Sequence, residues 1–256
     1  MIRVAVTGAA GRMGSEVIRA VNAEPDMEVV VGVDPAHPGE TLQGVVVSTD
    51  LSSAIEREHP DVMVDFTRPD AVETNVRTAL AAGVHCVVGT TGIPLETLQQ
   101  LAQGAPGQTC LFVAPNFAIG AVLMMRFAAQ AARFLPHVEI IELHHDRKAD
   151  APSGTALRTA ALIAENRPYV PEAPGCETEI ASGARGALAE GVSVHSVRLP
   201  GLVAHQEVIF GGEGQTLTIR HDSIDRTSFM PGVLLAIREV GKHSGLVVGL
   251  ERLMPE

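Results

Sequence analysis

The chain has 256 residues, of which 46% are hydrophobic but only 3% are aromatic, and it contains no Trp. This length allows two domains, and the composition is typical of a soluble α/β protein whose core consists mainly of Ala, Val, Leu and Ile. The formal net charge of -11, with only 19 Lys and Arg residues, excludes a nucleic-acid partner, because phosphate backbones require a basic protein face.

The first half of the chain alternates short β-branched runs with helical patterns, which predicts βαβ units and a parallel sheet. Met13, Val17 and Val21 recur at four-residue spacing and mark the apolar face of the first helix. Strands are predicted at residues 2–6, 28–33, 62–66, 85–88 and 110–114, with further helices near residues 71–82 and 94–103. We therefore expect a Rossmann-like α/β domain with a doubly wound parallel sheet.

The pattern changes after Asn116. A long helical pattern over residues 119–134 precedes a predicted strand at residues 138–143. A polar loop from His144 to Pro152 then leads into a helix that begins near Ser153. These elements predict a second domain that does not continue the βαβ repeat.

Three alternating runs between residues 192 and 222 are separated by Pro-Gly and Gly-Gly-Glu-Gly turns, which predicts a mostly antiparallel meander. The second domain is thus expected to be α+β with a mixed, mostly antiparallel sheet. Residues 166–185, rich in Pro, Gly and Glu, predict a mobile loop. We expect the chain to return to the first sheet after this domain, through a helix at residues 233–240 and an apolar run at residues 246–250.

No membrane span or targeting segment is predicted. The longest uncharged stretch, residues 110–125, is interrupted by Pro115. The first strand begins at Ile2, which leaves no room for a signal peptide before it. The chain has three Cys residues without CxxC spacing, which suits reduced thiols in the cytoplasm: Cys86, Cys110 and Cys176.

A glycine run follows the first strand and opens the first helix, as Gly8, Gly11 and Gly14. Such glycines allow a tight turn and a close approach of the backbone to a pyrophosphate, and the helix N-terminus supplies unpaired N–H donors. Asp34 ends the next strand, twenty residues beyond Gly14, where a carboxylate accepts hydrogen bonds from ribose hydroxyls. Together these features predict a dinucleotide-binding site.

The choice between NADH and NADPH is less sharply marked. Asp34 would repel a 2′-phosphate, whereas Arg12 is either a cation that moves toward one or a solvated surface charge. Pro35 offers no cation beside Asp34. We expect NADH to be preferred, with NADPH also usable.

Two further strand ends carry small and polar residues, at residues 89–92 and 114–117. Open α/β sheets bind ligands at the carboxyl edge of their strands. Gly, Pro and Asn also end strands as ordinary turn residues, and without other evidence this is the preferred interpretation.

Ionisable side chains gather just after the strand at residues 138–143, where His144, His145 and Lys148 stand together. His exchanges protons near neutral pH and Lys donates one, so the cluster suits proton delivery in a reduction. A charged surface loop is the alternative. No metal site is expected, because adjacent His side chains on an extended segment point to opposite faces.

The segment Ser153-Gly154-Thr155 opens the following helix. Hydroxyls and free N–H groups at a helix N-terminus form a site for a carboxylate, although a simple N-cap explains Ser153 equally well. An acidic protein that binds anionic ligands needs such local donors. Proton donors and an anion site only a few residues apart favour a functional role.

The chain closely resembles the 4-hydroxy-tetrahydrodipicolinate reductase family, also called dihydrodipicolinate reductases. The resemblance is carried by VTGAAGRMG, DFTRPDAV, VVGTTG, APNFAIG, IELHHDRKADAPSGTA and GLVAHQEVIFGGEGQTLTIRHDSIDRTSF, between residues 6 and 229. It implies a cofactor domain of residues 1–117 and 230–256, and a domain of residues 118–229 that binds the substrate and forms a homotetramer. Open edges in the predicted meander fit an oligomer.

The resemblance also implies roles for single residues. His144 would donate and accept the proton, and Lys148 would protonate the reduced product. His145, Gly154 and Thr155 would hold a dicarboxylate substrate. The implied cofactor contacts are Gly8, Ala9, Ala10, Gly11, Arg12, Met13, Asp34, Gly89, Thr90, Thr91, Ala114, Pro115, Asn116 and Phe117.

The implied reaction belongs to lysine and diaminopimelate biosynthesis. The 4-hydroxy ring compound loses water, a nicotinamide cofactor transfers a hydride to C4, and the resulting enamine is protonated. Some members of the family carry Arg directly after the acidic residue, and Pro35 here departs from that pattern. The alternatives are a related NAD(P)-dependent amino-acid dehydrogenase and a non-catalytic nicotinamide sensor.

Overall fold

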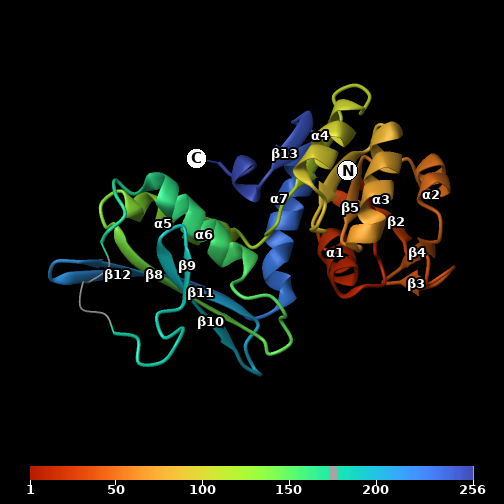
Figure 1. The fold of residues 1–256 in the computed structure, drawn as a ribbon. Coiled ribbons are helices and arrows are strands. Elements are labelled where there is room, and N and C mark those ends of the chain that lie inside the picture. Colours follow the sequence, from red (N-terminus) through yellow and green to blue (C-terminus); the bar gives the residue numbers. More distant parts are fainter. Residues whose placement is uncertain (173–177, 256) are drawn as a thin grey trace. The chain divides into compact units, whose positions relative to one another are not determined.

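The computed structural model describes residues 1–172 and 178–255, and Figure 1 shows the course of the chain. The chain divides into two compact units. Unit 1 contains Met1–Ile119 together with Arg226–Glu256, and unit 2 contains Gly120–Asp225. The expected boundaries lay at residues 117 and 230. No helix within the described residues is both long and apolar enough to cross a membrane.

Unit 1 is built on one large sheet. Its elements are β1 (Ile2–Thr7), α1 (Arg12–Asn22), β2 (Met27–Val33), β3 (Thr41–Leu42), β4 (Val45–Ser48), α2 (Leu51–Glu58), β5 (Val62–Asp65), α3 (Pro69–Ala81), β6 (His85–Val88), α4 (Leu95–Gln103), β7 (Cys110–Val113), η1 (Arg226–Phe229), α7 (Met230–Val240), β13 (Gly245–Val248) and η2 (Leu250–Arg252).

The strand order of this sheet, over the described residues, is β13-β7-β6-β5-β1-β2-β4-β3. All neighbours pair in parallel except β3 and β4. The chain moves outward from β1 in both directions, so β1 and β5 lie where the strand order reverses. Open α/β sheets bind ligands at this point, outside the carboxyl ends of the strands.

Helices cover both faces of the sheet in unit 1, as Figure 1 shows. Residues of α2, α3 and α4 join one apolar cluster with alternate strand residues such as Ala5 and Met63. The intervening residues Val4 and Val6 are equally buried, and α1 and α7 pack together on their side. The predicted doubly wound sheet is confirmed.

Five short elements in unit 1 were not predicted: β3, β4, α2 and the two 3₁₀ helices η1 and η2. The start of α2 does carry a local signal, because Asp50 is its N-cap and accepts a hydrogen bond of 2.8 Å from the amide of Ser53. Eight residues give too few helical turns for a clear apolar period. The two strands contain only two and four residues, which is below the length at which alternation is readable.

Unit 2 contains a smaller sheet. Its elements are α5 (Ile119–Ala132), which begins at the boundary, β8 (His137–His144), α6 (Gly154–Asn166), β9 (Ala187–Ala189), β10 (Val192–Arg198), β11 (Ala204–Gly212) and β12 (Gln215–Ser223). In the described part of the unit the strand order is β12-β11-β8-β10-β9, and only β8 and β10 pair in parallel. The expected mixed, mostly antiparallel sheet is confirmed.

The predicted meander is wrong at one strand. β11 and β12 form a hairpin, but β10 does not pair with β11, because β8 lies between them. Alternating hydrophobicity shows that a segment is a strand without identifying its partner. The insertion of β8 brings the ends of β8 and β10 side by side, with His144 paired to Arg198 in register.

One face of this sheet is covered by α6, which packs against β8, β9 and β10. The residues of β8 alternate accordingly, and both Ile140 and Glu142 are fully buried on the covered face. Cys86 and Cys110 in unit 1 are buried free thiols. Cys176 and part of the loop predicted at residues 166–185 lie outside the described residues.

Candidate functional site

The glycine turn between β1 and α1 is sterically fixed. Gly8 has a φ of 73°, in the left-handed region, and a Cβ there would come within 2.7 Å of the carbonyl oxygen of Phe66. A Cβ on Gly14 would collide with the carbonyl group of Gly8. Gly11 is the N-cap of α1, and its amide donates a hydrogen bond to the carbonyl oxygen of Gly8 at 3.0 Å. The turn therefore exposes backbone N–H groups at a helix N-terminus and fits a dinucleotide pyrophosphate.

Asp34 is tied to the same turn. Its Oδ2 accepts from the amide of Ala10 at 3.2 Å, and its Oδ1 accepts from the amide of Ala36 at 3.1 Å. His37 Nδ1 lies 3.3 Å from Oδ1. Burial opposes ionisation of Asp34, but these hydrogen bonds outweigh burial and hold its pKa below the ordinary value. The carboxylate is therefore charged at neutral pH and suited to ribose hydroxyls.

A buried carboxylate joins the strand ends beside this turn. Asp65, at the end of β5, is 0% exposed and accepts hydrogen bonds from side chains that carry no charge. Its donors are the hydroxyls of Thr7 at 2.7 Å, Thr67 at 2.8 Å and Thr90 at 2.7 Å, the amide of Asn75 at 2.8 Å and the backbone N–H of Thr67 at 3.0 Å. Asp65 thus connects the carboxyl ends of β1, β5 and β6.

The remaining predicted cofactor residues differ in how their side chains lie. Gly89 faces the ring of Phe66, with which a Cβ would collide. The side chains of Ala9, Ala114 and Phe117 belong to the core, and Phe117 packs 5.6 Å from Phe66 between ring centroids. The exposed members are Arg12, Thr91 and Pro115, whereas Ala10, Met13 and Asn116 are partly buried and Thr90 is buried.

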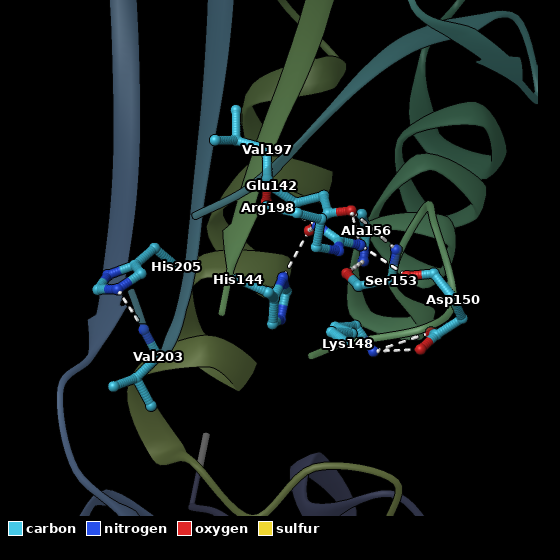
Figure 2. A network of polar contacts seen from close by, with 10 residues as sticks. All are labelled: Glu142, His144, Lys148, Asp150, Ser153, Ala156, Val197, Arg198, Val203 and His205. Atoms are coloured by element: carbon cyan, nitrogen blue, oxygen red, sulfur yellow. Dashed lines mark hydrogen bonds and ion pairs between the residues drawn. The ribbon is translucent and has the colours of Figure 1, made fainter. Parts of the chain in front are cut away.

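In unit 2, the sequence-predicted proton donors lie at the end of β8 (Figure 2). His144 is the last residue of the strand rather than the first of the loop, and its Nδ1 lies 2.5 Å from Oε2 of Glu142. Arg198, from β10, binds both carboxylate oxygens of Glu142 at 2.8 and 2.9 Å. The amide of Ser153 donates to the same carboxylate at 3.2 Å.

The pKa values in this cluster follow from burial and from these contacts. Burial opposes ionisation of Glu142, but hydrogen bonds from Arg198, Ser196 and His144 lower its pKa below the ordinary value. Burial also lowers the pKa of His144, and the attraction of Glu142 offsets this only in part. At neutral pH Glu142 is therefore a carboxylate and His144 a neutral imidazole.

Lys148 lies in the turn that follows β8. Its Nζ lies 2.7 and 2.8 Å from the carboxylate oxygens of Asp150, and its side chain is 21% exposed. Arg198 donates to the carbonyl oxygen of Asp150 at 2.7 Å. Arg198 therefore links Glu142, which contacts His144, to the backbone of Asp150, whose carboxylate binds Lys148 (Figure 2). Nδ1 of His145 is buried and has no hydrogen-bond partner among the described residues.

The N-terminus of α6 begins beside this cluster. Ser153 caps the helix, with its hydroxyl accepting from the amide of Ala156 at 3.2 Å. Gly154 and Thr155 form the first helical turn, and a Cβ on Gly154 would meet open space. Within the described residues, therefore, no neighbouring atom prevents a larger residue from replacing Gly154. An open helix N-terminus beside Lys148 is suited to a carboxylate group.

Sequence reasoning missed Glu142, Arg198 and Asp65. Glu142 did carry a readable signal, because the two-residue period of β8 places it on the same face as Ile140 and His144. A charged residue on the apolar face of a strand needs a buried partner. Arg198 could not be assigned, since its place depends on the pairing of β8 with β10.

In the described part of the chain, no group of three or more His, Cys, Asp or Glu residues is arranged to hold a metal ion.

Family models and full-length relatives agree on the relationship of this chain to known proteins. The model described as dihydrodipicolinate reductase, N-terminus, matches residues 2–117, and the model described as dihydrodipicolinate reductase, C-terminus, matches residues 120–254. The chain belongs to the dihydrodipicolinate reductase family. It is 53% identical to the 4-hydroxy-tetrahydrodipicolinate reductase of Moorella thermoacetica, with 99% of this chain and 98% of that protein covered.

Two other family members give similar results. The 4-hydroxy-tetrahydrodipicolinate reductase of Nocardia farcinica is 54% identical, with 98% of this chain and 97% of that protein covered. The dipicolinate-bound dihydrodipicolinate reductase from Paenisporosarcina sp. TG-14 is 47% identical and superposes with a TM-score of 0.90 over 99% of this chain and all of that one. The sequence-based recognition of the family is confirmed, and the chain is a reductase of the class that uses a nicotinamide cofactor.

More distant structures share only the fold. An amine dehydrogenase from Mycobacterium smegmatis is 18% identical with a TM-score of 0.68, covering 99% of this chain and 96% of that one. Such similarity shows a shared fold and carries no information on substrate. The full-length identity of about half therefore decides between the enzyme classes that the sequence left open, in favour of the reductase.

Proposed function

We propose that this chain reduces 4-hydroxy-tetrahydrodipicolinate to tetrahydrodipicolinate, with loss of water, in lysine and diaminopimelate biosynthesis. The observation that carries the proposal is the cluster at the end of β8. There, a neutral His144 and the Lys148 ammonium lie beside the open N-terminus of α6. Proton-transfer groups next to an anion site suit the reduction of a ring that bears two carboxylates.

The roles proposed for the side chains follow from their charge and position. Lys148 donates a proton to the enamine that reduction produces, and its charge also attracts the dicarboxylate. His144 exchanges the proton, since its neutral imidazole accepts one and its protonated form returns it. His145, Gly154 and Thr155 hold the substrate carboxylate at the start of α6. A related reductase binds dipicolinate, a planar ring with two carboxylates, which supports a ligand of this class.

The glycine turn and Asp34 support a dinucleotide in unit 1. A bound nicotinamide supplies the hydride for the reaction. We assign its contacts to the fourteen residues predicted from the sequence, from Gly8 to Phe117, and expect backbone contact where a side chain belongs to the core. Asp34 accepts from ribose hydroxyls, so NADH is the preferred cofactor and NADPH is also used.

Replacing Asp34 with Ala tests this preference. We expect the Kd for NADH to rise about tenfold, since a charged hydrogen bond contributes on the order of 1.5 kcal/mol. The Kd for NADPH changes less or falls, because the repulsion of the 2′-phosphate is removed as well. Fluorescence titration of both cofactors gives the ratio. Equal effects on both would contradict the role assigned to Asp34.

Replacing Gly154 with Ala tests the carboxylate site. The added methyl group enters open space in the structure, and Ala favours a helix by up to about 1 kcal/mol over Gly, so the melting temperature should not fall. A substrate carboxylate at this N-terminus would meet the methyl group. We expect KM for the substrate to rise roughly tenfold while the Kd for NADH stays constant. An unchanged KM would place the carboxylate elsewhere.

A coupled assay tests the proposed function as a whole. The hydroxy-tetrahydrodipicolinate is generated in situ, and the consumption of NADH and of NADPH is followed separately by absorbance. We expect consumption that depends on the chain and on the ring compound, and that is faster with NADH. No consumption with either cofactor would defeat the proposal, and a matched reaction without the ring compound excludes simple cofactor oxidation.

Two expectations remain part of the proposal: a homotetramer and a cytoplasmic location. β12 (Gln215–Ser223) is an edge strand of nine residues, and most of its side chains are exposed. Long open edges are better paired than exposed, which supports assembly through unit 2. Buried free thiols at Cys86 and Cys110 support a reducing compartment.

A further inference from the structure

Glu142 has an unusual position for a carboxylate. Its side chain is 0% exposed, on the face of β8 that α6 covers, between Ile140 and His144. Burying a charged group is costly unless hydrogen bonds and an opposite charge compensate it. The compensation here is extensive, since Arg198 binds both oxygens and the amide of Ser153 also donates. A structural ion pair alone would not require contact with a histidine as well.

The contact with His144 decides which nitrogen of its ring carries the proton. Oε2 of Glu142 is an acceptor only, so Nδ1 of a neutral His144, 2.5 Å away, carries the hydrogen. Nε2 is then unprotonated, and it makes no hydrogen bond within the described part of the chain. The neutral side chain of a free histidine favours the opposite tautomer, with the hydrogen on Nε2. The structure therefore holds His144 in its less common neutral form.

Arg198 holds the carboxylate of Glu142 in place, and this carboxylate in turn orients His144. Its two terminal nitrogens bind the two oxygens of Glu142 in a fork, which prevents rotation of the carboxylate plane. Its remaining contacts are backbone carbonyls, of Val197 at 2.8 Å and of Asp150 at 2.7 Å. The contact with Asp150 links the same guanidinium to the turn that carries Lys148. The pair thus contacts His144 directly and is linked, through the backbone of Asp150, to the turn that carries Lys148.

We propose that Glu142 and Arg198 act as a positioning pair that holds His144 as the Nδ1–H tautomer and presents unprotonated Nε2 to the substrate. The role in turnover rests on the proposed function, whereas the tautomer does not depend on it. Neither residue needs to touch the substrate. The arrangement leaves His144 ready to accept a proton without first turning or exchanging its own hydrogen.

Replacing Glu142 with Gln isolates the effect, because Gln has the same shape. Oε1 of Glu142 accepts from Arg198 and from the Ser153 amide, whereas Oε2 accepts from Arg198 and from His144. The NH2 group that the replacement introduces must occupy one of these two positions. It is less unfavourable at the Oε2 position, because His144 can change tautomer there and accept a hydrogen bond from it. In E142Q we therefore expect Nδ1 unprotonated and the hydrogen on Nε2, the wrong form for accepting a proton from the substrate.

The same strand provides a matched control. Glu139 lies on the opposite face of β8 and also contacts a histidine and an arginine, namely His195 at 2.8 Å through Nε2, and Arg185. It lies away from the proposed site and is partly exposed. E139Q removes the same charge from the same strand. We expect it to leave the tautomer of His144 and the turnover unchanged.

The decisive experiment is ¹⁵N NMR of the histidine rings in the full-length protein, with the signal of His144 identified by its loss in H144Q. We expect wild type to show protonated Nδ1 and unprotonated Nε2, and E142Q to show the reverse. In the coupled assay we expect E142Q to lower kcat about 100-fold, within the range for losing a general acid–base group, with an unchanged Kd for NADH.

The pH profile adds a second readout that a merely structural role would not move. The charged groups that act on His144 are Glu142, Lys148 and Arg198, and only Glu142 raises its pKa. Removing that charge lowers the pKa further, so the limb of kcat/KM that reports His144 moves to lower pH in E142Q and not in E139Q.

Three results would overturn the proposal: a wild-type His144 protonated on Nε2 at neutral pH, an E142Q protein with the wild-type tautomer, or an E142Q protein with unchanged kcat and pH profile. The wild-type tautomer is measured on the unaltered protein, so the proposal stays testable if E142Q does not fold. It is also independent of activity. A chain that holds the Nδ1–H tautomer but does not turn over the ring compound would refute the proposed function and leave the positioning pair intact.

Discussion

Replacing Lys148 or His144 with Ala is expected to lower kcat about 10²-fold to 10⁴-fold, the range by which a positioned acid or base accelerates a reaction. Hydride addition leaves electron density on the ring that a proton must neutralise, and Lys148 is the cation held in the turn after β8. The Kd for NADH should stay within about threefold of wild type, since both residues lie in unit 2 and the glycine turn lies in unit 1. Steady-state rates and cofactor titration measure the two quantities.

Arg147→Ala is the matched control for this prediction. Arg147 is exposed in the same turn, and replacing it with Ala removes one positive charge, as Lys148→Ala does. If Lys148 acted only by attracting the dicarboxylate, Lys148→Ala and Arg147→Ala would raise KM to a similar extent, and kcat would be the same in both variants. A large loss of NADH affinity in both Lys148→Ala and His144→Ala would show that the proton-transfer site is misplaced.

Replacing Asp65 with Ala is expected to destabilise the protein by about 3 to 5 kcal/mol, since it leaves several buried donors without an acceptor. The hydroxyls of Thr7, Thr67 and Thr90 and the amide of Asn75 all donate to this carboxylate. For a chain of this size, such a loss lowers the melting temperature by roughly 6 to 15 °C. Thermal unfolding followed by circular dichroism measures it.

Two comparisons make this prediction specific. Asp65→Asn should cost less, about 1 to 2 kcal/mol, because a threonine hydroxyl can rotate and accept from the new amide. Asp61 precedes the other end of β5 and is exposed, where it accepts from the amide of Arg3 at 2.8 Å. Asp61→Ala should cost under about 1 kcal/mol. A melting temperature of Asp65→Ala equal to that of Asp61→Ala would contradict the role of Asp65 in joining the strand ends.

The sequence was sufficient to predict the local parts of the fold and the site. The glycine turn, Asp34 and the strand before His144 are encoded by patterns within a few residues, and all lie where the structure has them or within one residue of that place. Such features depend on backbone sterics and on periodicity, which a single segment carries by itself.

The features that could not be predicted depend on contacts between distant segments. Arg198 reaches Glu142 only because β8 inserts between β10 and β11, and no property of residues 192–198 reveals that partner. Asp65 lies within one of the recognised motifs but was given no role, since three of its four side-chain donors come from other segments: Thr7, Asn75 and Thr90. Glu142 was the avoidable omission, because its place on the apolar face of β8 was readable from alternation alone.

The most direct test of the central claim, that this chain reduces the hydroxylated ring by hydride transfer, uses NADH that carries deuterium at both C4 positions. The product is formed in ordinary water and examined by mass spectrometry and NMR. We expect tetrahydrodipicolinate that contains one deuterium, located on the carbon that bore the hydroxyl group. Product without deuterium at that carbon, or no product although NADH is bound, would contradict the account.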